Sequence, residues 1–287
     1  MSLPIVERLG IPGIVDVHSH FMPDSVMRKV WAVFDQARDV YGVEWPVEYR
    51  GDDARRLVQL RGFGVRAFTS LVYAHKPGMA QWLNQWCADF AAQNPDCLQT
   101  ATFFPEDTAA AYLSEAISAG ARIFKIHLQV GAFDPRDPLL TPAWQQLAAT
   151  SIPVVVHCGS GPLPGPFTGA GPIGEVIARV PDLQVIVAHM GAPEYGEFLS
   201  LAEENPSVRL DTTMAFTDFM NELAVFPPEL LPRLHRAGLR GDVLFGSDFP
   251  NIPYPYSDAV EALVDLGLGD PWLRAVLYSN AAAIFDL

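Results

Sequence analysis

Short apolar segments rich in β-branched residues alternate with longer amphipathic segments along almost the whole chain of 287 residues. Several of the short segments are continuously hydrophobic, which is typical of strands buried on both faces of a parallel sheet. Eight strand–helix pairs favour a (β/α)8 TIM barrel over an open doubly wound sheet. We therefore predict a single α/β domain, a TIM barrel, over residues 1–287. The expected strands are 14–20, 65–73, 97–104, 121–128, 152–158, 184–190, 207–213 and 242–248.

Three segments extend this pattern. Residues 21–51 follow the first expected strand, contain several aromatic side chains and predict a lid that includes a helix; the alternative is an insertion without function. The Gly/Pro-rich residues 159–171 also follow a strand end, the side on which barrel active sites lie. Residues 270–286 predict an extra C-terminal helix packed on the barrel.

Composition restricts the partners. The net charge of −14 argues against nucleic acid and acidic membrane surfaces, because a negative protein repels phosphates, and leaves a small-molecule substrate. Cys87, Cys97 and Cys158 have no metal-ligand spacing and indicate reduced thiols. Residues 1–13 lack the pattern of a secretory signal, and no apolar run reaches the roughly 20 residues that span a bilayer. We expect a cytoplasmic protein.

The first expected strand ends in His18-Ser19-His20. Residues i and i+2 of a strand point to the same face, so the two imidazoles should lie side by side where the strand ends. Two converging imidazoles can provide the first two ligands of a divalent metal ion. The alternative is a pair of structural histidines at a strand end.

Further polar residues occupy the ends of other expected strands. His127, His157 and His189 end the fourth, fifth and sixth strands, and Asp248 ends the eighth. A barrel would bring these ends to one mouth. Three imidazoles and one carboxylate suit Zn²⁺ and also Mn²⁺, Fe²⁺ or Co²⁺. Asp248 could then take a proton from an activated water, with His189 as partner acid or electrostatic stabiliser.

Two more carboxylates lie near these positions. Asp16 precedes His18 by two residues on the same face, and we expect it to orient a histidine. Asp211 ends the seventh strand and could contact the site or cap the following loop.

The ordered set of His18, His20, His157, His189 and Asp248 resembles the amidohydrolase superfamily. Within it, the chain is similar to the branch that includes aminocarboxymuconate-semialdehyde decarboxylase, and its closing Asn280-Ala-Ala-Ala-Ile-Phe285 is similar to the Asn-Ala-Ala-Arg-Leu-Phe segment common there. The resemblance implies one divalent metal ion held by His18, His20, His157 and Asp248, with His189 close to the reacting groups. Members of this branch are mostly hydrolases or non-oxidative decarboxylases of small, often carboxylated or aromatic compounds.

Lys125 and His127 share one face of the fourth expected strand. Superfamily members with two metal ions often use a carboxylated lysine at the end of strand four, which would make Lys125 a bridging ligand. Alternatively, Lys125 and His127 bind a substrate anion or hydrogen-bond to the groups around the metal. A third interpretation is a structural polar pair inside the barrel.

We expect a metal-dependent hydrolase in which activated water attacks a C–N or C–O bond of a small, carboxylated or cyclic substrate. The main alternative is a non-oxidative decarboxylase on the same site, because function in a barrel depends on its loops. A non-catalytic binding protein and a metal-free hydrolase are further alternatives. The oligomeric state is left open, and an exposed face of the C-terminal helix could form a homodimer contact.

Overall fold

The computed structural model describes residues 3–287, which form two compact units. Unit 1 combines the N-terminal segment as far as Thr69 with the C-terminal segment from Asp211 to Leu287, and unit 2 is Ser70–Leu210. The strands that pair within each unit are parallel, as a repeated strand–helix pattern requires. The parallel α/β fold is therefore confirmed, whereas a single domain over residues 1–287 stays a prediction.

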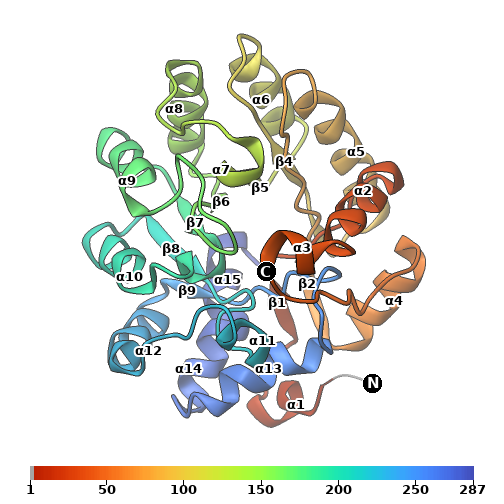
Figure 1. Cartoon of the computed structure of the whole chain (residues 1–287), viewed down its shortest axis with the longest axis vertical. Coiled ribbons are helices and arrows are strands. Elements are labelled where there is room, and N and C mark those ends of the chain that lie inside the picture. Colours follow the sequence, from red (N-terminus) through yellow and green to blue (C-terminus); the bar gives the residue numbers. More distant parts are fainter. Residues whose placement is uncertain (1–2) are drawn as a thin grey trace. The chain divides into compact units, whose positions relative to one another are not determined.

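Unit 1 is built around the first and last strands of the chain (Figure 1). β1 (Ile14–Asp16) pairs with β2 (Val65–Thr69), with Val15 opposite Ala67. The amide of Val17 donates to the carbonyl of Phe245, just beyond β9 (Val243–Leu244), so the two chain segments meet at the end of β1. The helices of unit 1 are α1 (Pro4–Leu9), α2 (Asp24–Phe34), α3 (Ala37–Tyr41), α4 (Asp53–Gly62), α11 (Asp218–Asn221), α12 (Leu231–Arg240), α13 (Tyr256–Asp265), α14 (Asp270–Arg274) and α15 (Asn280–Phe285).

Unit 2 contains a run of parallel strands in the order β4-β5-β6-β7-β8. Its longer helices lie along the outer side of these strands in Figure 1. The apolar residues of β6 are fully buried, as expected for a strand covered on both faces. The elements are β3 (Cys97–Leu98), β4 (Thr100–Thr102), β5 (Ile123–His127), β6 (Val154–His157), β7 (Val185–Val187), β8 (Val208–Asp211), α5 (Ala80–Gln93), α6 (Ala109–Ser118), α7 (Leu128–Gly131), α8 (Thr141–Thr150), α9 (Ala170–Arg179) and α10 (Tyr195–Glu204).

The strands are shorter than the sequence predicts. β1 ends at Asp16, so His18 and His20 lie beyond the strand, and β9 ends four residues before Asp248. Side chains explain the early end of β1. The Asp16 carboxylate accepts the amide of His18, and the Thr69 hydroxyl accepts the amide of Ser19. Amides bonded to side chains are not available to a neighbouring strand.

The insertion at residues 21–51 contains α2 and α3, so its predicted helical content is confirmed. Two of its indole nitrogens donate to one residue, Asn251. Trp31 Nε1 lies 3.1 Å from the Asn251 side-chain oxygen, and Trp45 Nε1 lies 2.7 Å from the Asn251 carbonyl oxygen. The insertion is thereby tied to the chain three residues beyond Asp248. Its action as a lid stays a prediction.

The C-terminal segment is helical, as predicted, but it is not one continuous helix. A π-helical turn at Ala275–Ser279 separates α14 from α15. Trp272 in α14 packs against Gly238 of α12 so closely that a Cβ on Gly238 would lie 2.1 Å from the indole nitrogen. Glycine therefore allows this helix contact.

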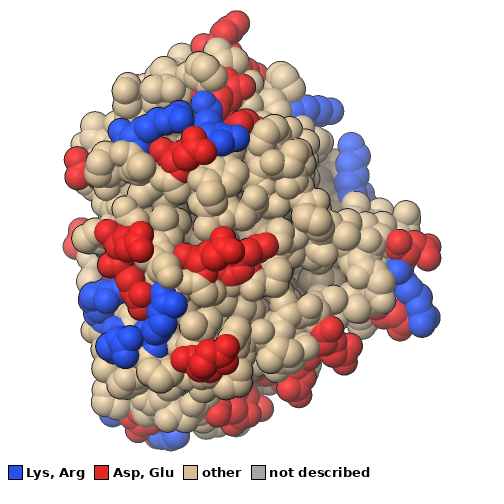
Figure 2. Space-filling view, turned by 60° about the vertical axis from the view of Figure 1, so that its left-hand side comes forward, with Lys and Arg blue, Asp and Glu red and all other residues tan. Residues whose placement is uncertain are grey.

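Acidic side chains are spread over separate patches of the face in Figure 2, and basic side chains lie beside some of them. In unit 2, Arg136 pairs with Asp134 at 2.8 Å and with Glu175 at 2.7 Å. Solvent reaches these side chains, and ion pairs in such positions contribute little to stability. Over residues 3–287, no helix has the length and apolar character needed to cross a membrane. The cytoplasmic location stays a prediction.

Candidate metal centre

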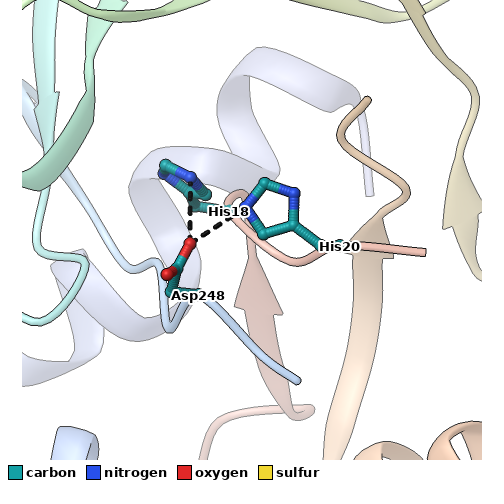
Figure 3. Close-up of side chains that lie close together, drawn as sticks. All are labelled: His18, His20 and Asp248. Carbon is teal, nitrogen blue, oxygen red and sulfur yellow. Dashed lines mark hydrogen bonds and ion pairs between the residues drawn. The ribbon is translucent and has the colours of Figure 1, made fainter. Parts of the chain in front are cut away.

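His18, His20 and Asp248 converge at the end of β1 (Figure 3). Asp248 Oδ1 lies 2.9 Å from His20 Nε2 and 3.5 Å from His18 Nε2. All three residues are buried, and the two imidazole centroids are 5.2 Å apart. His20 and Asp248 are 228 positions apart in the sequence, and the fold brings them together.

These three donors fit a divalent ion. Ligand atoms about 2.1 Å from a tetrahedral ion are separated by about 3.4 Å. The separations of 2.9 and 3.5 Å between donor atoms lie close to that value. The set combines neutral imidazoles with a carboxylate, which suits Zn²⁺ and other first-row divalent ions. The cluster could therefore hold one metal ion.

Asp211 fixes the orientation of His18. Its Oδ2 accepts a hydrogen bond from His18 Nδ1 at 2.8 Å, which leaves Nε2 as the nitrogen directed at Asp248. Asp211 Oδ1 also accepts the amide of Thr213 at 3.1 Å, so the carboxylate is itself held. A carboxylate behind a ligating histidine sets the tautomer and raises the basicity of the ring. Asp211 thus contacts a residue of the cluster and also caps the following loop, the two roles that the sequence left open.

Asp16 connects the two segments that provide the cluster. One carboxylate oxygen accepts the amides of His18 and Ser247, both at 3.1 Å. The other accepts the hydroxyls of Ser247 at 2.6 Å and Tyr256 at 3.0 Å. Burial raises the pKa of Asp16 to about 7, although these hydrogen bonds act in the opposite direction. Asp16 thus fixes the backbone of His18, whereas Asp211 orients its ring.

Asp248 is held by its backbone as well as by its side chain. Its amide donates to the carbonyl of His18 at 2.8 Å, and its φ of 73° lies in the left-handed region. Two residues earlier, a Cβ on Gly246 would lie 2.6 Å from His18 Cβ and 2.2 Å from the Thr213 hydroxyl oxygen. Only glycine lets the chain before Asp248 approach His18 so closely.

A second group of histidines lies in unit 2. The register of β5 and β6 places His127 opposite His157, and their rings stack with centroids 3.8 Å apart and planes 11° apart. The His189 ring centroid lies 4.8 Å from that of His157. His157 Nε2 donates to the carbonyl of Gly161 at 3.0 Å. The three predicted strand-end histidines of this unit are therefore neighbours.

Lys125 is buried in β5, on the same strand as His127. Its carbonyl accepts the Thr102 hydroxyl at 2.7 Å, and the His127 ring packs against Tyr73 at 5.1 Å between centroids. The roles of Lys125 and His127 in binding a substrate anion stay predictions, as does the role of His157 as a metal ligand.

Sequence reasoning missed Glu194, whose carboxylate accepts hydrogen bonds from Ser160. It also did not identify Asn251 as the residue that receives both indoles. Neither residue belongs to a motif or a strand end. The one available signal was their position shortly after His189 and Asp248, in loops expected beside the site.

Comparisons with known proteins identify the family and the fold. The family model described as Amidohydrolase matches residues 15–287. No curated protein matches the sequence. Among solved structures, a TIM-barrel protein from Bordetella bronchiseptica is 18% identical with a TM-score of 0.76, covering 95% of this chain and 98% of its own.

Two further structures have hydrolase names. A probable 2-pyrone-4,6-dicarboxylic acid hydrolase from Acinetobacter baumannii is 14% identical, with a TM-score of 0.61 and coverage of 96% of this chain and 100% of its own. A dihydroorotase from Campylobacter jejuni is 15% identical, with a TM-score of 0.58 and coverage of 96% and 83%. At these identities the likeness shows the fold, which is the predicted α/β class of TIM-barrel proteins. Because the family model spans nearly the whole sequence, the chain belongs to the amidohydrolase family.

Proposed function

We propose that this amidohydrolase is a metal-dependent hydrolase that cleaves a C–N or C–O bond in a small, carboxylated or cyclic substrate. The observation that carries the proposal is the buried cluster of His18, His20 and Asp248, with Asp211 hydrogen-bonded to the far side of the His18 ring. A buried group of donors with its own orienting carboxylate matches what a metal site requires.

The residues of unit 1 would have different roles in this reaction. When bound, a divalent cation supplies a Lewis acid that polarises the bond under attack and eases the ionisation of water. His18 and His20 would hold that cation, and Asp211 keeps His18 Nε2 directed at the cluster. Asp248 would be a ligand and would also accept the proton of the attacking water at its carboxylate.

The roles proposed for unit 2 rest on the order of residues in the sequence. His157 would complete the ligand set, and His189 would act as the partner acid that donates a proton to the leaving group. Lys125 and His127 would bind a substrate carboxylate. Two named neighbours are a dihydroorotase and a probable pyrone-dicarboxylic acid hydrolase, the latter with citric acid bound, which supports a small carboxylated substrate.

We propose Zn²⁺ as the native ion, with Mn²⁺, Fe²⁺ and Co²⁺ as the alternatives that the same donors accept. We also place the chain in the branch similar to aminocarboxymuconate-semialdehyde decarboxylase. Its partner would be a small molecule and not nucleic acid or a membrane, and a homodimer is the oligomer to test first.

The metal site is tested by the metal content of protein purified without chelators. Wild type should contain about one divalent ion per chain, and His20→Ala and Asp248→Ala should lose most of it. His235→Ala, on α12 in the same unit, is the matched control and should retain the ion. A folded wild type without metal, or full metal content in both cluster variants, would refute the proposal.

The reaction type is tested with carboxylated lactones and cyclic amides in H₂¹⁸O. Hydrolysis predicts that one ¹⁸O atom from solvent appears in the product. Release of CO₂ without ¹⁸O incorporation would instead identify the decarboxylase alternative. Retained activity of thoroughly metal-free protein would contradict both.

A further inference from the structure

In unit 2, the loop after β6 and the loop after β7 are joined by three hydrogen bonds. The Ser160 amide donates to Glu194 Oε2 at 3.0 Å, and the Ser160 hydroxyl donates to Glu194 Oε1. The Gly161 amide donates to the carbonyl of Ala192 at 3.0 Å. Two consecutive residues of one loop are therefore fixed to the other.

The two loops also touch through their backbones. A Cβ on Gly159 would lie 2.5 Å from the Ala192 carbonyl oxygen, and one on Gly161 would lie 3.1 Å from it. No other residue fits at position 159 without moving the loops apart. The hydrogen bonds thus act across a contact that has little freedom to slide.

Each loop follows a histidine. The ring of His157 donates through Nε2 to the carbonyl of Gly161, the residue next to Ser160. The carbonyl of His189 accepts the amide of Ala192 at 3.0 Å, and the rings of the two histidines are 4.8 Å apart between centroids. The pairing of the loops therefore fixes one histidine relative to the other. It also assigns a hydrogen to Nε2 of His157, because a carbonyl oxygen can only accept.

Glu194 has a simpler possible role, which the structure does not support. It occupies the N-cap position of α10 (Tyr195–Glu204), where a polar side chain often accepts an amide of the first turn. Within the described part of the chain, its side chain makes no such hydrogen bond. Both carboxylate oxygens are used on Ser160 instead.

We propose that Glu194 is a positioning residue, which holds the Ser160–Gly161 turn so that the Gly161 carbonyl sets the ring orientation and tautomer of His157 beside His189. The proposal rests on the proposed function in so far as His157 serves as a metal ligand. A carboxylate that acts two hydrogen bonds away from a ligand changes metal affinity without touching the ion.

The test compares Glu194→Ala and Glu194→Gln with Glu197→Gln. Glu197 lies in the first turn of α10 and is exposed, so its neutralisation removes the same charge near the same helix N-terminus without affecting Ser160. The first readout is the ring ¹⁵N shifts of His157 in metal-free, ¹⁵N-histidine-labelled protein, assigned with His157→Ala. The second is Zn²⁺ affinity measured by competition with a chelator.

We expect His157 to be a single tautomer with hydrogen on Nε2 in wild type and in Glu197→Gln. Glu194→Ala should give averaged ring shifts and a 10- to 100-fold loss of Zn²⁺ affinity, and Glu194→Gln, which keeps one acceptor oxygen, should lie between. If Glu194→Ala does not fold, Ser160→Ala removes the hydroxyl donor alone and should show the same changes in weaker form.

Unchanged His157 shifts in Glu194→Ala, or equal effects in Glu197→Gln, would overturn the proposal. The ring shifts are measured without metal, so they show whether Glu194 positions the His157 ring even if His157 is not a metal ligand. If His157→Ala binds Zn²⁺ as tightly as wild type, the ligand set of the proposed function is wrong, and the shifts still show whether Glu194 positions the ring.

Discussion

His18 and Asp211 form a buried hydrogen bond of 2.8 Å between Nδ1 and Oδ2, in which the carboxylate belongs to the end of β8 and the imidazole to the turn after β1. The Asp211 side chain is fully buried and accepts the Thr213 amide with its other oxygen. It therefore has a fixed position from which to hold the ring.

Replacing Asp211 with Asn should lower metal affinity about 10- to 100-fold, because an amide can no longer stabilise the ring with a negative charge. Titration of the metal-free protein with Zn²⁺ measures the change. Asp265→Asn, an exposed carboxylate at the end of α13, serves as the control. Equal affinities for all three proteins would show that Asp211 has no such role.

Gly246→Ala should destabilise the protein by about 1–3 kcal/mol, because the new Cβ would overlap His18 Cβ and the Thr213 hydroxyl. It should also reduce metal content, since His18 or the segment before Asp248 must move. Gly62→Ala is the matched control, because a Cβ there, apart from the adjacent residues and the backbone of its own helix, meets no atom of the described residues within 4 Å. Denaturant unfolding compares the two, and equal stabilities would contradict the packing argument.

Trp45→Phe should loosen the insertion, because it keeps an aromatic ring of smaller size and removes the indole N–H that donates to the Asn251 carbonyl. The expected cost is about 1 kcal/mol, and amide exchange in α2 and α3 should become faster. Trp82→Phe changes a partly exposed indole on α5 and should leave this exchange unaltered. Unchanged exchange in both variants would show that the bond to Asn251 does not hold the insertion.

Tyr256→Phe removes one of the donors to the buried Asp16 carboxylate and should lower the free energy of unfolding by about 1–2 kcal/mol. Tyr278→Phe, whose hydroxyl makes only a 3.4 Å contact near the surface, should change it far less. Thermal unfolding at constant pH distinguishes these outcomes. A loss no larger in Tyr256→Phe than in Tyr278→Phe would mean that the remaining donors satisfy Asp16.

The helices were well predicted from the sequence, because amphipathic spacing and helix-start residues are local signals. For example, the amphipathic spacing of residues 53–61 predicts a helix, and the structure has α4 (Asp53–Gly62) there, where Asp52 caps the first turn by accepting the Arg55 amide. For the C-terminal segment, the sequence predicts one helix but not its interruption. Its π-helical turn at Ala275–Ser279 depends on packing that the pattern does not reveal.

The candidate metal site was also predicted only in part. His18, His20 and Asp248 could be predicted as a cluster, but the reason given for His18 and His20 was wrong in detail, since they lie beyond β1 and not on it. The amides that would have extended the strand are accepted by Asp16 and Thr69. Hydrogen bonds between residues 50 positions apart, such as Ser19 to Thr69, leave no periodic trace in the sequence.

The left-handed backbone at Asp248 limits which residues can evolve there. Asp, Asn and His tolerate a positive φ far better than other side chains, and glycine tolerates it freely. Exchange of Asp248 for Asn would remove the negative charge of the donor with little conformational cost. Exchange for Glu would lengthen the side chain and would also strain the backbone. Natural variation at this position should therefore favour short side chains. Such variation would change which metal ion the site prefers through the charge of the donor more readily than through the length of its side chain.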